Sequence, residues 1–128
     1  MSRNAISTTG VSVNPAYSHV VRAGDLLVVS GQVALDEQGA VLGPGHPVAQ
    51  TRQAFENLRR VLESAGASLA DVVKLTIFVT DPDIRPAVSE IRNSLFDEPR
   101  PASTYLIVAG LADPAFLIEV EALAWLGS

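Results

Sequence analysis

The sequence predicts an α+β fold in which one sheet carries two helices on one face, with the elements in the order ββαβαββ. Two segments show the three- and four-residue apolar spacing of a helix face, and the other apolar segments are short and β-branched. The chain has 128 residues, 48% of them hydrophobic, without an internal repeat or linker. Residues 1–128 are therefore predicted to form one domain.

The first two strands are expected over residues 17–22 and 26–34. Between them lies Ala23-Gly24-Asp25, a sequence rich in turn-forming residues, so the pair is predicted to form a hairpin with a three-residue turn. Residues 35–47 contain three glycines and two prolines and are predicted to form a loop.

The first helix is predicted between Val48 and Ala65, where apolar side chains recur on one face and charged ones fill the other. Gly66 is a natural end for this helix. Residues 72–80 read Val-Val-Lys-Leu-Thr-Ile-Phe-Val-Thr and predict a strand because β-branched residues dominate them.

The second helix is expected to begin near Asp81 or Asp83, which can cap its free N–H groups. Its apolar stripe comprises Ile84, Val88, Ile91 and Leu95, and Pro86 is tolerated because it lies in the first turn.

Two strands are predicted to complete the sheet, over residues 103–109 and 116–126. In the second of these strands the two-residue period separates an apolar face from a face that carries both Glu119 and Glu121. The two glutamates are therefore expected to point the same way.

Composition excludes several classes of function. The chain has no cysteine, so disulfides and thiolate chemistry are impossible, and its two histidines, His19 and His46, lack partners at metal-ligand spacing. A net charge of -5 opposes nucleic-acid binding, which depends on clustered Lys and Arg. No apolar run approaches the ~20 residues that span a bilayer, and no signal peptide is recognisable. We expect a cytoplasmic protein with no membrane, nucleic-acid or metal partner.

The order of short motifs along the chain resembles the reactive intermediate deaminase (RidA/YjgF) superfamily from Tyr17 to Trp125. The resemblance rests on motifs in the second strand, at the end of the first helix and through the last third of the chain. These motifs are Ser30-Gly31-Gln32, Glu63-Ser64-Ala65-Gly66-Ala67, Asp71-Val72-Val73-Lys74, Pro101-Ala102-Ser103-Thr104 and Ile118-Glu119-Val120-Glu121.

The resemblance implies a RidA/YjgF-like (chorismate-mutase-like) fold that assembles as a homotrimeric barrel, with small-molecule ligands bound in clefts between subunits. It also implies cofactor-independent hydrolysis of enamines and imines to carbonyl compounds and ammonia. Such substrates are usually released by pyridoxal-phosphate enzymes.

The chain departs from the family pattern at Ser103, where the family has an arginine that grips the substrate carboxylate. A hydroxyl offers one donor and no charge, so this grip is expected to be lost and the substrate to be altered. Arg100 is the first candidate to compensate. It is three residues away, however, and a solvated cation beside Glu98 is the favoured interpretation.

The resemblance assigns the remaining site residues. Glu119 matches the glutamate that orients or activates water, with an interface role as the alternative. The predicted substrate-binding residues are Tyr17, Gly31, Ser103 and Thr104, of which Tyr17 could instead be an edge-strand aromatic and the two hydroxyls could satisfy backbone.

Two other functions remain open at this point. One is a pathway-specific hydrolase or cyclase that acts on an unstable intermediate through Glu119. The other is a trimer that binds a small molecule without catalysis.

Overall fold

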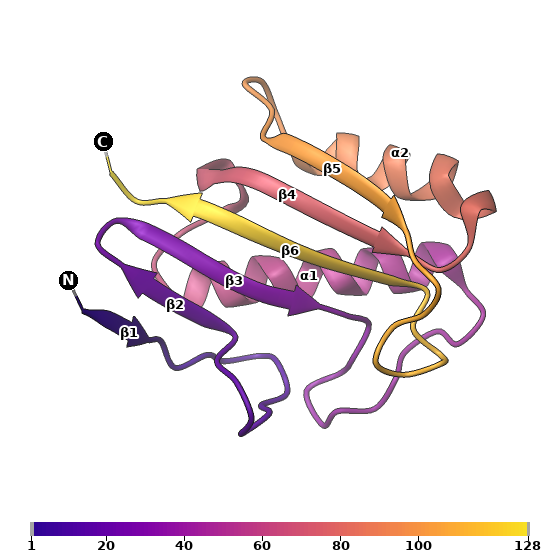
Figure 1. Ribbon diagram of the computed structural model, residues 1–128, viewed down its shortest axis with the longest axis horizontal. Helices are drawn as coiled ribbons and strands as arrows, with labels where there is room; N and C mark the ends of the chain where they lie inside the picture. The colour runs from indigo at the N-terminus through magenta and orange to yellow at the C-terminus, as the bar shows by residue number, and fades with distance from the viewer. Residues whose placement is uncertain (1, 128) are drawn as a thin grey trace.

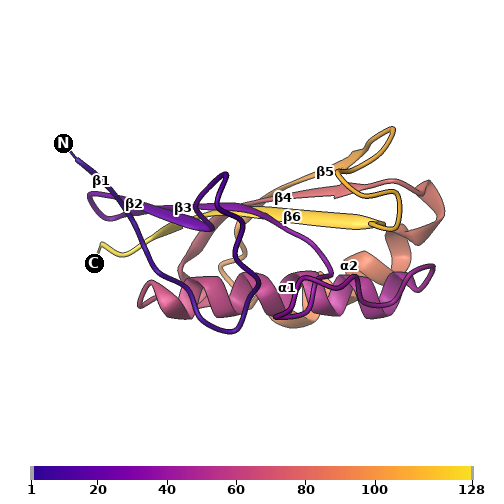
Figure 2. The same cartoon turned by 90° about the horizontal axis from the view of Figure 1, so that it is seen from below.

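The computed structural model of the protein describes residues 2–127. One six-stranded sheet, in the order β1-β2-β3-β6-β4-β5, packs two α-helices on a single face (Figures 1 and 2). The strands are β1 (Arg3–Ala5), β2 (Val20–Ala23), β3 (Leu26–Gln32), β4 (Val72–Val79), β5 (Ala102–Ile107) and β6 (Ile118–Trp125). The helices are α1 (Pro47–Ser64) and α2 (Arg85–Leu95). A short 3-10 turn, η1 (Leu69–Asp71), follows α1, and another, η2 (Pro82–Ile84), precedes α2. The predicted α+β class is confirmed, and the predicted elements follow in the predicted order after one additional strand, β1.

The N-terminal part of the sheet differs from the prediction in three ways. A strand was not expected at β1, whose three residues are all exposed and so carry no alternating apolar signal. Strand β2 begins at Val20, so Tyr17 precedes the strand, in a bend. The hairpin turn contains two residues rather than three, because Ala23 and Leu26 pair directly and Gly24 adopts a φ of 61°.

Helix α1 forms because its apolar stripe faces the sheet and Pro47 starts it at a position that needs no N–H donor. Its buried side chains include Phe55, Leu58 and Leu62. Gly66, with a φ of 79°, follows the helix end as expected.

The second helix begins later than its capping residue suggested. The side chain of Asp81 accepts a hydrogen bond from the Asp83 N–H at 2.8 Å, and this caps η2 rather than α2. Pro86 lies in the first turn of α2, and Val88 and Ile91 are buried against the core. The stripe predicted from the sequence is therefore the packed face, except at Leu95, which is 37% exposed.

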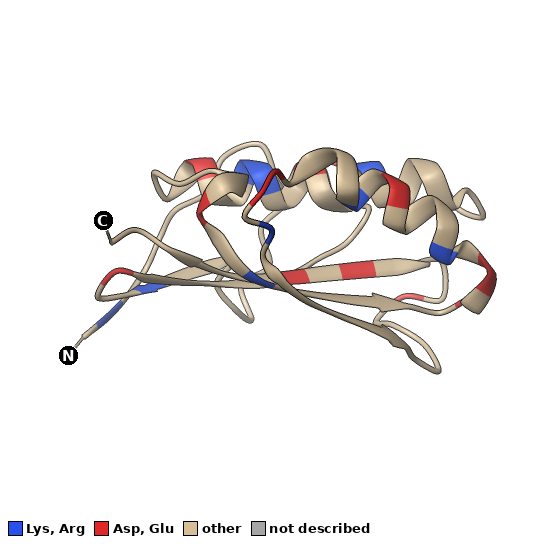
Figure 3. Ribbon diagram, turned by 90° about the horizontal axis from the view of Figure 1, so that it is seen from above, with Lys and Arg blue, Asp and Glu red and all other residues tan. Residues whose placement is uncertain are grey.

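Strand β6 lies between β3 and β4 and alternates as predicted. Ile118, Val120, Ala122 and Ala124 are buried under the helices, whereas the residues between them, Glu119 included, face the open side of the sheet. This alternation confirms that Glu119 and Glu121 share a face. Figure 3 shows acidic positions along one strand of the sheet.

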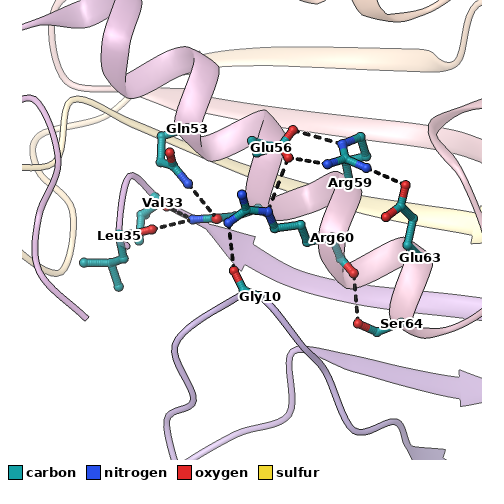
Figure 4. A network of polar contacts seen from close by, with 10 residues as sticks. Gly10, Val33, Leu35, Gln53, Glu56, Arg59, Arg60, Glu63 and Ser64 are labelled. Carbon is teal, nitrogen blue, oxygen red and sulfur yellow. Dashed lines mark hydrogen bonds and ion pairs between the residues drawn. The ribbon is translucent and has the colours of Figure 1, made fainter. Parts of the chain in front are cut away.

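The N-terminal segment is tied to α1 by polar contacts (Figure 4). The Arg60 guanidinium donates to the Gly10 carbonyl at 2.9 Å, and the buried amide of Asn57 donates to the carbonyls of Val33 and Leu35, both at 2.9 Å. These contacts hold the loop after β3 and the segment before β2 beside the helix, where they enclose a cavity.

Candidate functional site

Glu119 and Gly31 lie in direct contact on adjacent strands. A β-bulge in β3 places Ser30 and Gly31 opposite a single residue of β6, and the Glu119 side chain crosses the backbone at this point. A Cβ on Gly31 would lie 2.5 Å from the Glu119 Cδ and 2.7 Å from its Oε1. Only glycine therefore leaves room for this carboxyl group.

The carboxyl group of Glu119 is half-buried and weakly solvated. Burial is the main cause that raises its pKa above the ordinary value of 4.5, and the neighbouring charge of Glu121 adds to the effect. No protein group among residues 2–127 donates a hydrogen bond to it, so nothing stabilises the ionised form. A carboxyl group in this state keeps its proton to a higher pH than an exposed carboxyl group does.

This pKa shift predicts a pH-dependent stability difference for Glu119→Gln. Between about pH 4.5 and the raised pKa, the native state binds more protons than the unfolded state. The contribution of this group to the free energy of unfolding therefore decreases as the pH rises through that window. Glutamine does not ionise, so the melting temperature of Glu119→Gln relative to the native chain should increase with pH and then level off.

Thermal denaturation between about pH 4 and pH 8 measures this difference. Glu90→Gln, at an exposed position of α2, is the control for the loss of a carboxylate from the surface. A Glu119→Gln difference that is constant with pH would contradict the shift.

Tyr17 and Gly31 both line a second feature of the site, a cavity of about 460 Å³. The Tyr17 side chain is 53% exposed and meets the His19 ring edge to face at 6.2 Å. The cavity is lined by the segment from Val11 to Tyr17, by the end of β3 and by the loop that follows it. Gly31 thus borders both this cavity and Glu119.

His19 forms hydrogen bonds that link segments of the cavity wall. Its Nε2 contacts the Ser12 carbonyl at 2.5 Å, which identifies Nε2 as the protonated nitrogen, and its Nδ1 accepts from the Gln32 amide at 3.0 Å. Both ring nitrogens are therefore engaged. Among residues 2–127, no three His, Asp or Glu side chains gather as possible metal ligands.

Thr104 and Ser103 lie on opposite faces of the edge strand β5. Thr104 pairs with Thr76 on the open face, and the Lys74 Nζ donates to its hydroxyl at 2.5 Å. Ser103 pairs with the buried Leu75, on the face that the helices cover. Of these two residues, Thr104 therefore shares a face with Glu119 of its own chain, and Ser103 does not.

Ser103 lines a separate cavity of about 180 Å³ beside α2. Arg100 lines the same cavity, although its guanidinium also contacts Glu98 at 3.3 Å, as the favoured interpretation expected. Arg92 borders it too, and this contact escaped the sequence analysis. The available signal was the seven-residue spacing of Arg85 and Arg92, which places them on one helix face.

Comparison with known proteins identifies the family. The family model for endoribonuclease L-PSP matches residues 8–126. The chain is 37% identical over 108 residues to the 3-aminoacrylate deaminase RutC of Acinetobacter baylyi, which covers 84% of this chain and 85% of the relative. The chain therefore belongs to the RidA/YjgF superfamily, which includes this family model.

Two further comparisons support the assignment. The crystal structure of RidA from an Antarctic Psychrobacter superposes with a TM-score of 0.87 at 31% identity, covering 95% of this chain and 98% of that one. The mitochondrial protein mmf2 of Schizosaccharomyces pombe is 37% identical over 127 residues, 97% of this chain and 98% of the relative. The name of this relative places it in mitochondria, and the cytoplasmic location of the present chain stays a prediction. None of the helices described over residues 2–127 has the length and apolar character of a membrane span.

Proposed function

We propose that this chain hydrolyses a small imine or enamine to a carbonyl compound and ammonia, without a cofactor, using Glu119 as the proton carrier. The observation that carries the proposal is the half-buried Glu119 carboxyl group, seated against Gly31 and lacking a protein hydrogen-bond donor among the described residues. The 37% identity to a 3-aminoacrylate deaminase supports the same reaction class.

Glu119 can serve each proton transfer of such a reaction. A carboxylic acid with a raised pKa can first supply a proton to the carbon of an enamine. The enamine thereby becomes an iminium ion. The resulting carboxylate then accepts a proton from the water that attacks the iminium carbon. Glu119 then gives that proton to nitrogen and the carbon–nitrogen bond breaks. Ammonia leaves, and the carboxylate takes the proton of the hydroxyl group as the carbonyl group forms, which restores the starting acid.

We further propose that the substrate differs from that of family members with an arginine at position 103. Ser103 cannot form a bidentate pair with an α-carboxylate, and its hydroxyl carries no charge. Losing such a charged pair in a desolvated cleft costs on the order of 2–5 kcal/mol. A substrate that has no α-carboxylate to place beside Ser103 avoids that loss. Tyr17, Gly31 and Thr104 remain available to contact such a substrate.

The decay of 2-iminobutyrate generated in solution tests the altered substrate. We expect the native chain to leave the decay rate at the no-protein level and Ser103→Arg to accelerate it, because a guanidinium can pair with the α-carboxylate. Ser7→Arg, at an exposed N-terminal position, is the control for added charge. Acceleration by the native chain would show that the carboxylate is recognised without an arginine at position 103.

We also propose that the protein is a homotrimer with ligand clefts between subunits. The open face of the sheet carries apolar side chains that no helix covers, and a second copy of the sheet is the partner that the family resemblance implies. The exposed apolar residues of this face are Val28, Leu106 and Trp125, at 42%, 44% and 49%.

Light scattering is therefore expected to give the mass of three chains. Val28→Glu places a charge on the open face and should lower the mass toward one chain. The matched control is Val13→Glu, because Val13 is 74% exposed in the N-terminal segment, outside the sheet. A native mass of one chain, or equal effects of the two variants, would rule out this interface.

The ribonuclease description of the family model is a weaker guide to function. The net charge of -5 opposes RNA binding, and Figure 3 shows acidic and basic residues mixed along the helices rather than a basic stripe. We therefore do not propose a nucleic-acid partner.

A further inference from the structure

The cavity beside Ser103 combines positive charge with an apolar wall. It lies between β5 and the C-terminal end of α2 and measures about 180 Å³. It is smaller than the roughly 300–1,000 Å³ of sites for drug-sized ligands, so its size suits a short metabolite. The residues that line it are Arg92, Asn93, Phe96, Arg100, Pro101 and Ser103.

Both guanidinium groups of the cavity are held by one residue, Asn93. The Arg92 Nε donates to the Asn93 side-chain oxygen and the Arg100 Nη1 donates to its backbone carbonyl, each at 3.2 Å. Both terminal nitrogens of Arg92 and the Nη2 of Arg100 make no hydrogen bond to any of residues 2–127. These free N–H groups and the Ser103 hydroxyl can donate hydrogen bonds to an anion.

The carboxylate that competes for this site is weakly held. Glu98 contacts the Arg100 Nε at 3.3 Å, but its side chain is 82% exposed. An ion pair this exposed contributes roughly 0–1 kcal/mol, so an anion in the cavity can displace it or leave it in place. Arg85, stacked over the Tyr105 ring at 5.4 Å, adds positive charge on the same face of α2.

The surroundings favour a monoanion with a small apolar part. The C-terminal end of a helix carries partial negative charge, which penalises a dianion such as phosphate more than a carboxylate. The ring of Phe96, itself buried, and the ring of Pro101 line the cavity and can contact a short hydrocarbon chain.

We propose that this cavity binds a short-chain carboxylate, with Arg92 and Arg100 as its charged ligands. The inference does not depend on the proposed hydrolase activity. The acid group can belong to a substrate or to a free metabolite, and both have the same chemistry.

Titration of the ¹⁵N-labelled full-length chain with butyrate, followed by NMR, tests the proposal. We expect saturable shifts at the residues that line the cavity, and none with butyramide, which is nearly isosteric but neutral. Arg92→Gln and Arg100→Gln should each weaken binding about tenfold or more, because each removes a charge-assisted pair. The matched control is Arg22→Gln, since Arg22 contacts Asp25 at the same 3.3 Å and is similarly exposed.

Three results would overturn the proposal: no saturable shift with butyrate, equal binding of butyramide, or equal weakening by Arg22→Gln. Tighter binding of inorganic phosphate would overturn the carboxylate class. Unchanged dispersion of the variant spectra shows that each variant is folded. If a turnover assay is in hand, inhibition by butyrate that Arg92→Gln relieves assigns the acid group to the substrate, and binding without inhibition assigns it to a free metabolite. Because the titration needs no turnover, failure of the proposed function leaves its result intact.

Discussion

Glu119→Gln is expected to lower the rate of imine or enamine hydrolysis by about 10²–10⁴-fold, the range typical of a lost general acid or base. Glutamine preserves the shape of the side chain over Gly31 but cannot carry the proton. The measurement is the turnover rate with a substrate that the native chain hydrolyses, at fixed pH.

Glu121→Gln is the matched control, because Glu121 lies two residues away on the same face and is exposed. Its loss should change the rate little. If Glu119→Gln retains full activity, Glu119 has an interface role. If the chain binds its ligand equally well with Glu or Gln at position 119 and neither form shows turnover, the protein is the non-catalytic trimer.

Gly31→Ala is expected to lower the same rate by about 10²-fold while leaving the fold nearly as stable. The added methyl group would lie 2.5 Å from the Glu119 Cδ, so the carboxyl group must move. The end of a flexible side chain can do this at little cost to packing, but displacement by about 1 Å can cost 10²-fold in catalysis. The rate and the melting temperature, measured together, separate these two effects.

Gly110→Ala provides the control, since a Cβ at Gly110 meets no atom within 4 Å. The double variant Gly31→Ala/Glu119→Gln should be no slower than Glu119→Gln alone, because both changes act on one group. Additive losses would mean that Gly31 contributes separately, through its backbone.

The regular elements could be predicted because their signals are local. The stripe of α1 and the alternation of β6 appear in consecutive residues, and each decides which side chains are buried. Strand β1 could not be predicted in the same way. Its three exposed residues belong to the sheet only because they pair with β2, and pairing partners are remote in sequence.

The candidate site was predictable only in part. The period of two indicated that Glu119 and Glu121 share a face, but the bulge that seats Glu119 over Gly31 depends on the pairing of β3 with β6. For Arg100, the distance along an extended chain suggested a doubtful reach toward Ser103. The two residues nevertheless line one cavity, because α2 packs beside β5 and closes its other side.

The sequence by itself determined the α+β class, the burial pattern of each long element, the absence of cysteine chemistry and the uncharged serine at position 103. Tertiary structure alone decided that Glu119 lies on Gly31 with a raised pKa, and that two guanidinium groups gather beside Ser103. The physical reason is that periodicity fixes the direction of a side chain relative to its own backbone. Its neighbours and its solvation depend on strand register and helix packing, which join segments far apart in the chain.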